Sequence, residues 1–205
     1  MLLSKSAVPL LATMIFLTGC GNSNSDSGST PKKAAMALAQ AMQQGDAAGI
    51  KAASVGGDPQ VIDALAASMV AHRALADAAT AKFGAAAKGF DDDAGTLRDF
   101  AQRLDEAEVS INGDTATITV TGTSTTWLTL KKVNGDWKAD FSQLPGFSPS
   151  AESAAMAATM QKTAEVTQEM AAEVTAGKFA TIDQAREARI EKIKAAIQNM
   201  PSTRA

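Results

Sequence analysis

The chain has 205 residues, of which 45% are hydrophobic but only 4% aromatic, and its formal net charge is −3. This length and apolar content suit one ordinary domain with a substantial core. The weak negative charge argues against a nucleic-acid partner, because binding nucleic acid needs a clustered basic surface. The only cysteine, Cys20, rules out an intramolecular disulfide and a cysteine-based zinc site.

The N-terminal segment has the pattern of an export signal. Lys5 supplies its positive charge, and Ala7–Leu17 is an apolar run interrupted only by Pro9 and Thr13. The run is too short to cross a bilayer, which needs roughly 20 apolar residues. We therefore expect the segment to direct export rather than to remain as a membrane span.

Leu17-Thr18-Gly19-Cys20 ends this segment with a branched apolar residue, two small residues and a cysteine. The stretch resembles a bacterial lipobox, which implies that residues 1–19 are a signal peptide and that Cys20 is lipidated. Two or three acyl chains would hold the protein permanently on a membrane. The resemblance also implies a place in the bacterial cell envelope, facing the periplasm. Gly21 stands where an aspartate often retains lipoproteins at the inner membrane, which favours the outer membrane.

Residues 20–30 are expected to form a flexible linker that starts at the lipidated cysteine. The stretch from Gly21 to Thr30 consists almost entirely of Gly, Ser, Asn and Asp. Such a composition cannot bury enough apolar surface to offset the loss of chain entropy on ordering.

Helices are predicted for the first half of the body. Thr30-Pro31 and Asp58-Pro59 each place a capping residue before a proline, which is the pattern of a helix start. Apolar residues then recur at helical spacing up to Gly45 and Phe83. Asp46 caps a short helix that runs to about Val55, and after the loop 84–93 a further helix carries Leu97, Phe100, Ala101 and Leu104.

Beyond residue 105 the apolar residues alternate, which predicts strands, and two Asn-Gly pairs predict hairpin turns. With Asn112-Gly113 as the first loop, the expected pairs are Ile111 with Asp114, Val109 with Ala116 and Ala107 with Ile118. With Asn134-Gly135 as the second loop, they are Lys132 with Trp137, Leu130 with Ala139 and Leu128 with Phe141. Joined through 122–125, the hairpins predict a four-stranded antiparallel meander whose apolar face the helices cover.

The C-terminal residues 148–205 predict a helical hairpin. The first helix carries Met156, Met160, Met170 and Val174 at helical spacing and ends near Gly177. A capping box, Thr181 with Gln184, begins the second helix, which carries Ile182, Ile190, Ile193, Ile197 and Met200. Neither stripe is stable alone in water, so we expect the hairpin to pack back on the body.

The body resembles a known superfamily. Helices precede a meander, Gly-Asp follows the first helix, and Asn-Gly-Asp-Trp-Lys at 134–138 enters the last strand. These features are similar to NTF2-like (cystatin-like) α+β domains and cover about 31–141, so the predicted body spans 31–147. The resemblance implies an α+β fold, but NTF2-like domains include enzymes, ligand binders and interaction modules.

His72, the only histidine, is the one candidate for catalysis. It lies on or beside the apolar stripe of the helix 59–83, where an imidazole can act as a general base in a pocket or can be a structural core histidine. A carboxylate within hydrogen-bonding reach in a cavity would favour the enzyme.

Other side chains have simpler interpretations. Asp91-Asp92-Asp93 lacks the spacing of a calcium loop and suits a solvated turn before a helix, so no metal is expected. Trp137 is predicted to be core. Trp127 lies on the opposite face, where it is covered by the C-terminal hairpin or, if exposed, is a contact residue. The methionine stripe of 156, 160 and 170 can pack internally or dock a partner helix.

The sequence thus favours a non-enzymatic, lipid-anchored envelope protein that binds a partner protein or a small apolar ligand, with no cofactor. Two alternatives stay open, namely a small NTF2-like enzyme with His72 as its base and a purely structural envelope lipoprotein.

We expect Cys20 to be acylated and the signal peptide to be absent from the mature protein. Mass spectrometry of protein extracted from membranes should give the mass of the chain from Cys20 plus its acyl groups. The variant Cys20→Ser should lose both the processing and the membrane association. A Cys20→Ser protein that is cut and retained on membranes like the wild type would contradict the lipobox interpretation.

Overall fold

The chain folds into helices and one mixed sheet, an α+β arrangement, in a computed structural model that describes residues 30–88, 90, 103–119 and 126–200. The α+β class predicted from the sequence is confirmed. The predicted signal peptide, Cys20 and most of the linker lie outside the described residues, as do Asp91–Asp93, most of the helix predicted after Asp93 and the connection 122–125.

Three helices come first, and each begins at the capping residue that the sequence indicates. Helix α1 spans Pro31–Gln44, α2 spans Ala47–Ala53 and α3 spans Pro59–Phe83. The Thr30 hydroxyl accepts a hydrogen bond from the Lys33 amide, and Asp46 accepts one from the Gly49 amide. Gly45 ends α1 with a positive φ of 65°, a conformation that favours glycine.

The sheet has five described strands in the order β1-β5-β4-β3-β2. The strands are β1 Ser54–Val55, β2 Glu108–Asn112, β3 Thr115–Thr119, β4 Thr126–Val133 and β5 Asp136–Asp140. The predicted meander of β2 to β5 is present, but β1 adds a strand that pairs parallel with β5. The prediction of four antiparallel strands was therefore incomplete, because a two-residue strand is too short to show an alternating pattern. The expected helix to Val55 instead ends at Ala53.

The predicted register of the first hairpin was wrong. The loop residues are Gly113 and Asp114, so that Ile111 pairs with Ala116, rather than Asp114 as expected, and Val109 pairs with Ile118. Gly113 has a φ of 60°, as expected at the first central position of a type II′ turn. This register places apolar residues opposite each other on one face of the sheet, whereas the predicted register would have placed Ile111 opposite a carboxylate.

The predicted register of the second hairpin is confirmed for Leu130 with Ala139 and for Lys132 with Trp137. Asn134 and Gly135 both have positive φ, as a type I′ turn requires. Phe141 does not pair with Leu128, because β5 ends at Asp140 and Phe141 begins a short 3-10 turn, η2 (Phe141–Gln143).

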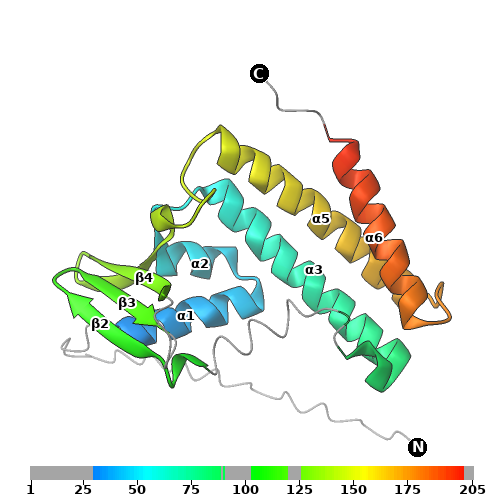
Figure 1. Ribbon diagram of the computed structural model, residues 1–205, viewed down its shortest axis with the longest axis horizontal. Coiled ribbons are helices and arrows are strands. Elements are labelled where there is room, and N and C mark those ends of the chain that lie inside the picture. Colours follow the sequence, from blue (N-terminus) through cyan, green and yellow to red (C-terminus); the bar gives the residue numbers. More distant parts are fainter. Residues whose placement is uncertain (1–29, 89, 91–102, 120–125, 201–205) are drawn as a thin grey trace, which may run out of the picture.

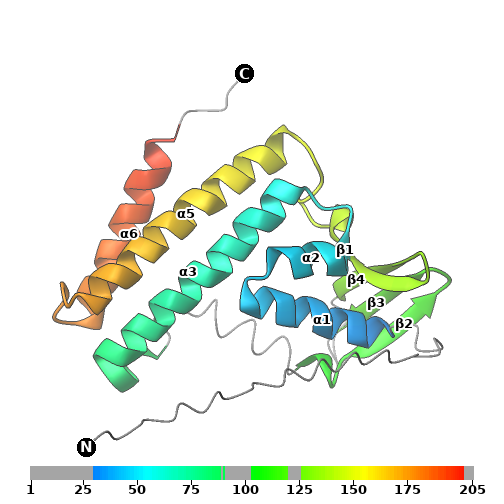
Figure 2. The same cartoon turned by 180° about the vertical axis from the view of Figure 1, so that it is seen from behind.

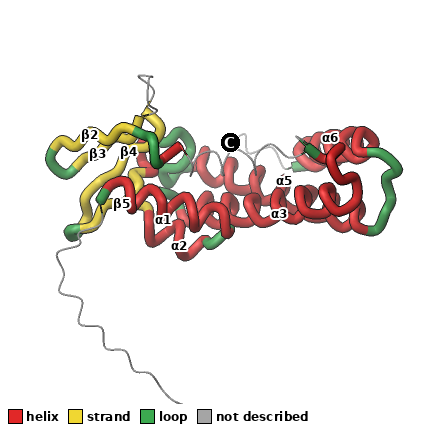
Figure 3. Tube along the Cα trace, turned by 90° about the horizontal axis from the view of Figure 1, so that it is seen from below, coloured by secondary structure: helices red, strands yellow, loops and turns green. Residues whose placement is uncertain are grey.

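The C-terminal helices are α5 (Ala151–Thr175) and α6 (Ile182–Gln198). Helix α5 lies along α3 and runs in the same direction, and α6 returns along α5 (Figures 1 and 2). The strands gather at one end of the molecule and α6 lies at the other (Figure 3). The hairpin therefore contacts the body through α3 rather than through the sheet.

Among the described residues three apolar cores lie along α3, and the smallest joins Val61 and Ala64 of α3 with Ala157 of α5. The sheet core joins α1, α2, the first half of α3 and the sheet, with Leu38, Ile50, Ile62, Ile118 and Leu130 among its members. The helical core joins the second half of α3 with α5 and α6 and includes Leu75, Val166, Met170, Val174 and Ala185. Phe90, in a segment predicted only as a loop, is also buried in the helical core.

Helix α6 is the least embedded of the long helices. Ala185 is its only fully buried residue, and Ile190 and Ile197 are exposed. The prediction that Ile190 and Ile197 face α5 was wrong. The α6 residues that pack in the helical core are instead Ala185, Ala188, Ala196, Ile182 and Ile193.

A hydrogen-bond cluster joins the first turns of α3 and α5. The Ser153 hydroxyl donates to the Asp58 carboxylate at 2.6 Å, and Asp58 also caps α3 through the Gln60 amide. Ser153 and Ser150 form a reciprocal capping box at the start of α5. Asp58 thus lies where the positive ends of two helix dipoles meet.

The two donors lower the pKa of Asp58 below its ordinary value of 3.8, with the Ser153 hydroxyl as the larger cause. The ionised carboxylate therefore contributes stability above pH 3.8, and this contribution is lost as the pH falls through the folded-state pKa. We expect Asp58→Asn to be less stable than the wild type at pH 7, with a difference in melting temperature that shrinks below pH 3.8. Thermal unfolding between pH 7 and pH 3 measures it.

Ser153→Ala should lower stability at pH 7 by about 1–3 kcal/mol, because the hydroxyl bonds the ionised Asp58 carboxylate and also accepts from the Ser150 amide, and it should weaken the same acid dependence. A difference between wild type and Asp58→Asn that stays constant into acid would contradict this account of the contact.

Candidate functional site

His72 is buried at the interface of α3 with α6, with 6% of its surface exposed. Its Nδ1 atom lies 3.3 Å from an Nη atom of Arg189 on α6. A guanidinium group can only donate, so Nδ1 is the acceptor in this contact. The lone pair that a general base would use is therefore occupied, and this neighbour is a cation rather than a carboxylate.

Thr167 on α5 and His72 on α3 occupy equivalent positions along their two parallel helices. The Asp58–Ser153 contact fixes how the parallel helices are aligned, and His72 and Thr167 each lie fourteen residues further along their helix. Thr167 is fully buried. We call His72, Thr167 and the half-buried Arg189 the buried polar cluster, in which the contact is between His72 and Arg189.

The buried polar cluster is incompletely satisfied. Within the described part of the chain, Thr167 Oγ1 and Arg189 Nε are buried without a hydrogen-bond partner. A buried polar atom without a partner costs about 1–3 kcal/mol. Each of these two unpaired atoms therefore lowers the stability of the contact in which it is buried.

Ion pairs at the surface offset part of this weakness. The Lys192 ammonium on α6 contacts Glu169 at 2.6 Å and Glu173 at 2.9 Å on α5, and Lys178 contacts Glu173 at 2.9 Å. The hydrogen bond from Lys178, and then that from Lys192, lowers the pKa of Glu173. Glu169 and then Glu173 raise the pKa of Lys192. These charges position α6 and form no reactive pair.

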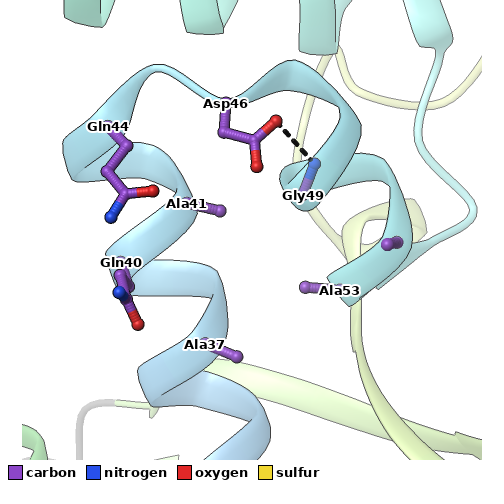
Figure 4. Close-up of a pocket in the computed structure, with 8 residues that line it drawn as sticks. Ala37, Gln40, Ala41, Gln44, Asp46, Gly49 and Ala53 are labelled. Atoms are coloured by element: carbon purple, nitrogen blue, oxygen red, sulfur yellow. Dashed lines mark hydrogen bonds between the residues drawn. The ribbon is translucent and has the colours of Figure 1, made fainter. Parts of the chain in front are cut away.

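A groove between α1 and α2 has a volume of about 380 Å³ (Figure 4). The Gln40 and Gln44 amides offer donors and acceptors along it, while Asp46 caps α2 through the Gly49 amide. The groove is otherwise lined by Ala37, Ala41, Ala52 and Ala53. The groove is open to the surface, and Asp46 is the one charged residue in its lining.

Two further hollows are also open to the surface. One continues along α1 past Lys32, Lys33 and Met36, with a volume of about 840 Å³. The other lies between α3 and α5, has a volume of about 660 Å³, and is lined by Val70 and alanines with Glu165 and Glu169 beside them.

The two tryptophans differ in burial. Trp137 is buried in the sheet core, which confirms its prediction as a core residue. Trp127 is half-buried against the sheet core, and the Arg103 guanidinium lies 6.0 Å from its ring centroid. Its partial cover therefore comes from the sheet end of the molecule, away from the C-terminal hairpin.

The methionine stripe of α5 packs internally, one of the two alternatives that the sequence left open. Met170 is buried in the helical core, and Met156 and Met160 are half-buried against Val61 and Ala64 of α3.

Strand β2 carries the most exposed apolar residues of the sheet. Val109 is 37% exposed and Ile111 is 57% exposed, whereas their partners on β3, Ile118 and Ala116, are fully buried. The helices thus cover the sheet as far as β3, and β2 forms its edge among the described strands. The sequence pattern marked these residues as apolar, but only the packing shows that their face is uncovered.

Neither a membrane-spanning helix nor a metal-ligand set occurs among the residues with described positions. No helix there is both long and apolar enough to cross a membrane. No three His, Cys, Asp or Glu side chains come together there as a ligand set. Cys20 and Asp91–Asp93 are outside this part of the chain.

Comparison with known proteins gave no significant match to a protein-family model, a curated protein or a solved structure. The resemblances to lipoproteins and to NTF2-like domains therefore stay predictions.

Replacing Thr167 by Val should stabilise the protein by about 1–3 kcal/mol, because it removes the unpaired hydroxyl and keeps the side-chain shape. Chemical denaturation measures the free energy of unfolding. Thr159→Val is the matched control, since the Thr159 hydroxyl donates to the Ala155 carbonyl on the same helix. A loss of stability in Thr167→Val that is as large as that in Thr159→Val would show that the Thr167 hydroxyl has a partner.

Proposed function

We propose that the protein is a lipid-anchored component of the bacterial cell envelope that acts by binding another protein through strand β2. The single observation that supports binding at this place is the exposed apolar pair Val109 and Ile111 on an edge strand. An edge strand presents unpaired backbone N–H and C=O groups, so it can add a strand from a partner.

The lipobox pattern supports the anchor. Leu17-Thr18-Gly19-Cys20 follows a short apolar run, and a polar linker separates Cys20 from α1. Acyl chains on Cys20 would hold the body at the periplasmic surface, more favourably on the outer membrane than on the inner one. The body would then meet its partner within the envelope.

A partner protein fits the described surface better than a small apolar ligand does. The three described hollows are open and carry glutamine, lysine or glutamate side chains. The NTF2-like enzyme alternative is weaker because the Nδ1 lone pair of His72 accepts from Arg189. The order of α1–α3 followed by β2–β5 supports an NTF2-like origin for 31–147.

The test is site-specific photo-crosslinking in living bacteria. A photoreactive amino acid replaces Ile111 in the full chain, and irradiation should give a discrete product heavier than the chain. Ile190 on α6 is the matched control position, because its exposed fraction of 58% is nearly the same as the 57% of Ile111. The same product should be weaker in Cys20→Ser cells, because the anchor raises the effective concentration of the partners.

Identical crosslinking at positions 111 and 190, or none at position 111, would contradict binding through β2. A purely structural envelope lipoprotein would give this second result.

A further inference from the structure

We propose that the partner of strand β2 is β2 of a second copy of this chain, in an antiparallel pair that joins two sheets edge to edge. The inference rests on the proposed function for the use of β2 and adds the identity of the partner. It depends on the hydrogen-bonding direction of the strand, on its side-chain order and on the place where the linker joins the body.

The backbone N–H and C=O groups of successive β2 residues point alternately toward β3 and toward the outer edge of the sheet. In the β2–β3 hairpin, Asn112 and Thr115 flank a two-residue loop, so they form a hydrogen-bonded pair, and such pairs alternate along an antiparallel ladder. Glu108, Ser110 and Asn112 therefore direct their N–H and C=O groups toward β3. Val109 and Ile111 direct theirs to the outer edge, which pairs with none of the described strands.

The two β2 strands of the proposed pair fit in one register. If the symmetry axis passes through Ser110, Val109 of each copy lies opposite Ile111 of the other. These are the residues whose backbone groups face outward, so each such pair can exchange hydrogen bonds across the edge. Their side chains share one face, so the pairing also covers the apolar surface that the helices leave exposed.

The charged side chains of β2 do not oppose this pairing. The same register places Glu108 opposite Asn112, so the carboxylates of the two copies are not direct neighbours. Like charges directly opposite each other would destabilise the pair. Strand β2 also has no proline or lysine, which are the residues that commonly protect a sheet edge from pairing.

The linker joins the body at the start of α1, which is tied to the segment before β2. The Lys32 ammonium, at the start of α1, donates to the Asp105 carbonyl at 2.6 Å, and Asp105 lies three residues before β2. The linker therefore joins the body close to β2 (Figure 1). Two lipid-anchored copies would hold their β2 strands near the same membrane surface, which raises their effective concentration.

The test is disulfide trapping in the full chain carrying Cys20→Ser, so that an introduced cysteine is the only thiol. In the proposed register Ser110 lies opposite its own copy as a non-hydrogen-bonded pair, with Cα atoms about 4.5 Å apart. This separation lies within the range of a disulfide. Mild oxidation of purified Ser110→Cys should therefore give a covalent dimer on a non-reducing gel.

Glu108→Cys is the matched control, because it lies on the same face of the same strand but opposite Asn112 of the partner. It should stay largely monomeric. Adding Ile111→Lys to Ser110→Cys should abolish the covalent dimer, whereas adding Ile190→Lys should not. Circular dichroism checks that each variant is folded, and the comparison of positions 110 and 108 decides the outcome if Ile111→Lys does not fold.

Equal trapping at positions 108 and 110, or none at either, would overturn the proposed pair. If photo-crosslinking at position 111 then captured a different protein, partner binding through β2 would stand and the second copy would be wrong. If position 111 captured nothing, both proposals would fall.

Discussion

The parallel contact of α3 with α5 is the constraint on which the rest of the structure depends. Helix α3 is about 37 Å long, which is too long for one face to lie on a small sheet. Its first half packs in the sheet core and its second half in the helical core, and α5 is aligned beside it by the Asp58–Ser153 hydrogen bond. Without this contact the sheet and the C-terminal hairpin would share almost no surface.

The energetic consequences are uneven along the molecule. Large apolar side chains such as Leu38, Leu75 and Met170 are fully buried near α3, while α6 is attached through alanines, two half-buried isoleucines and ion pairs. Local opening costs least where few apolar contacts are buried. We therefore expect α6 to open before α3 and α5 separate, and the sheet core to persist longest.

The candidate site is the exposed apolar face of strand β2 rather than a cavity, because the helices do not extend over this strand. Helices α1 and α2 pack on the sheet, whose apolar residues on β3, β4 and β5 are buried, and β2 lies beyond them with one apolar face exposed. A monomer that evolved only to be soluble would normally have polar side chains there. The apolar pair of β2 and the attachment point of the linker lie at the same end of the molecule. Lipid anchoring would therefore bring this binding surface close to the membrane.

The sequence by itself determined the elements, because their signals are local. Capping residues before prolines, alternating apolar residues and the Asn134-Gly135 turn each act over a few residues, and they located α1, α3, β4 and β5 correctly. Only the tertiary structure decided the rest. Three features depend on groups that are far apart in the chain, namely the parallel strand β1, the contact of His72 with Arg189 and the exposure of Ile111. The register of the first hairpin depends on which of two possible two-residue turns forms at Gly113. Local periodicity does not record which distant surfaces meet or which turn is chosen.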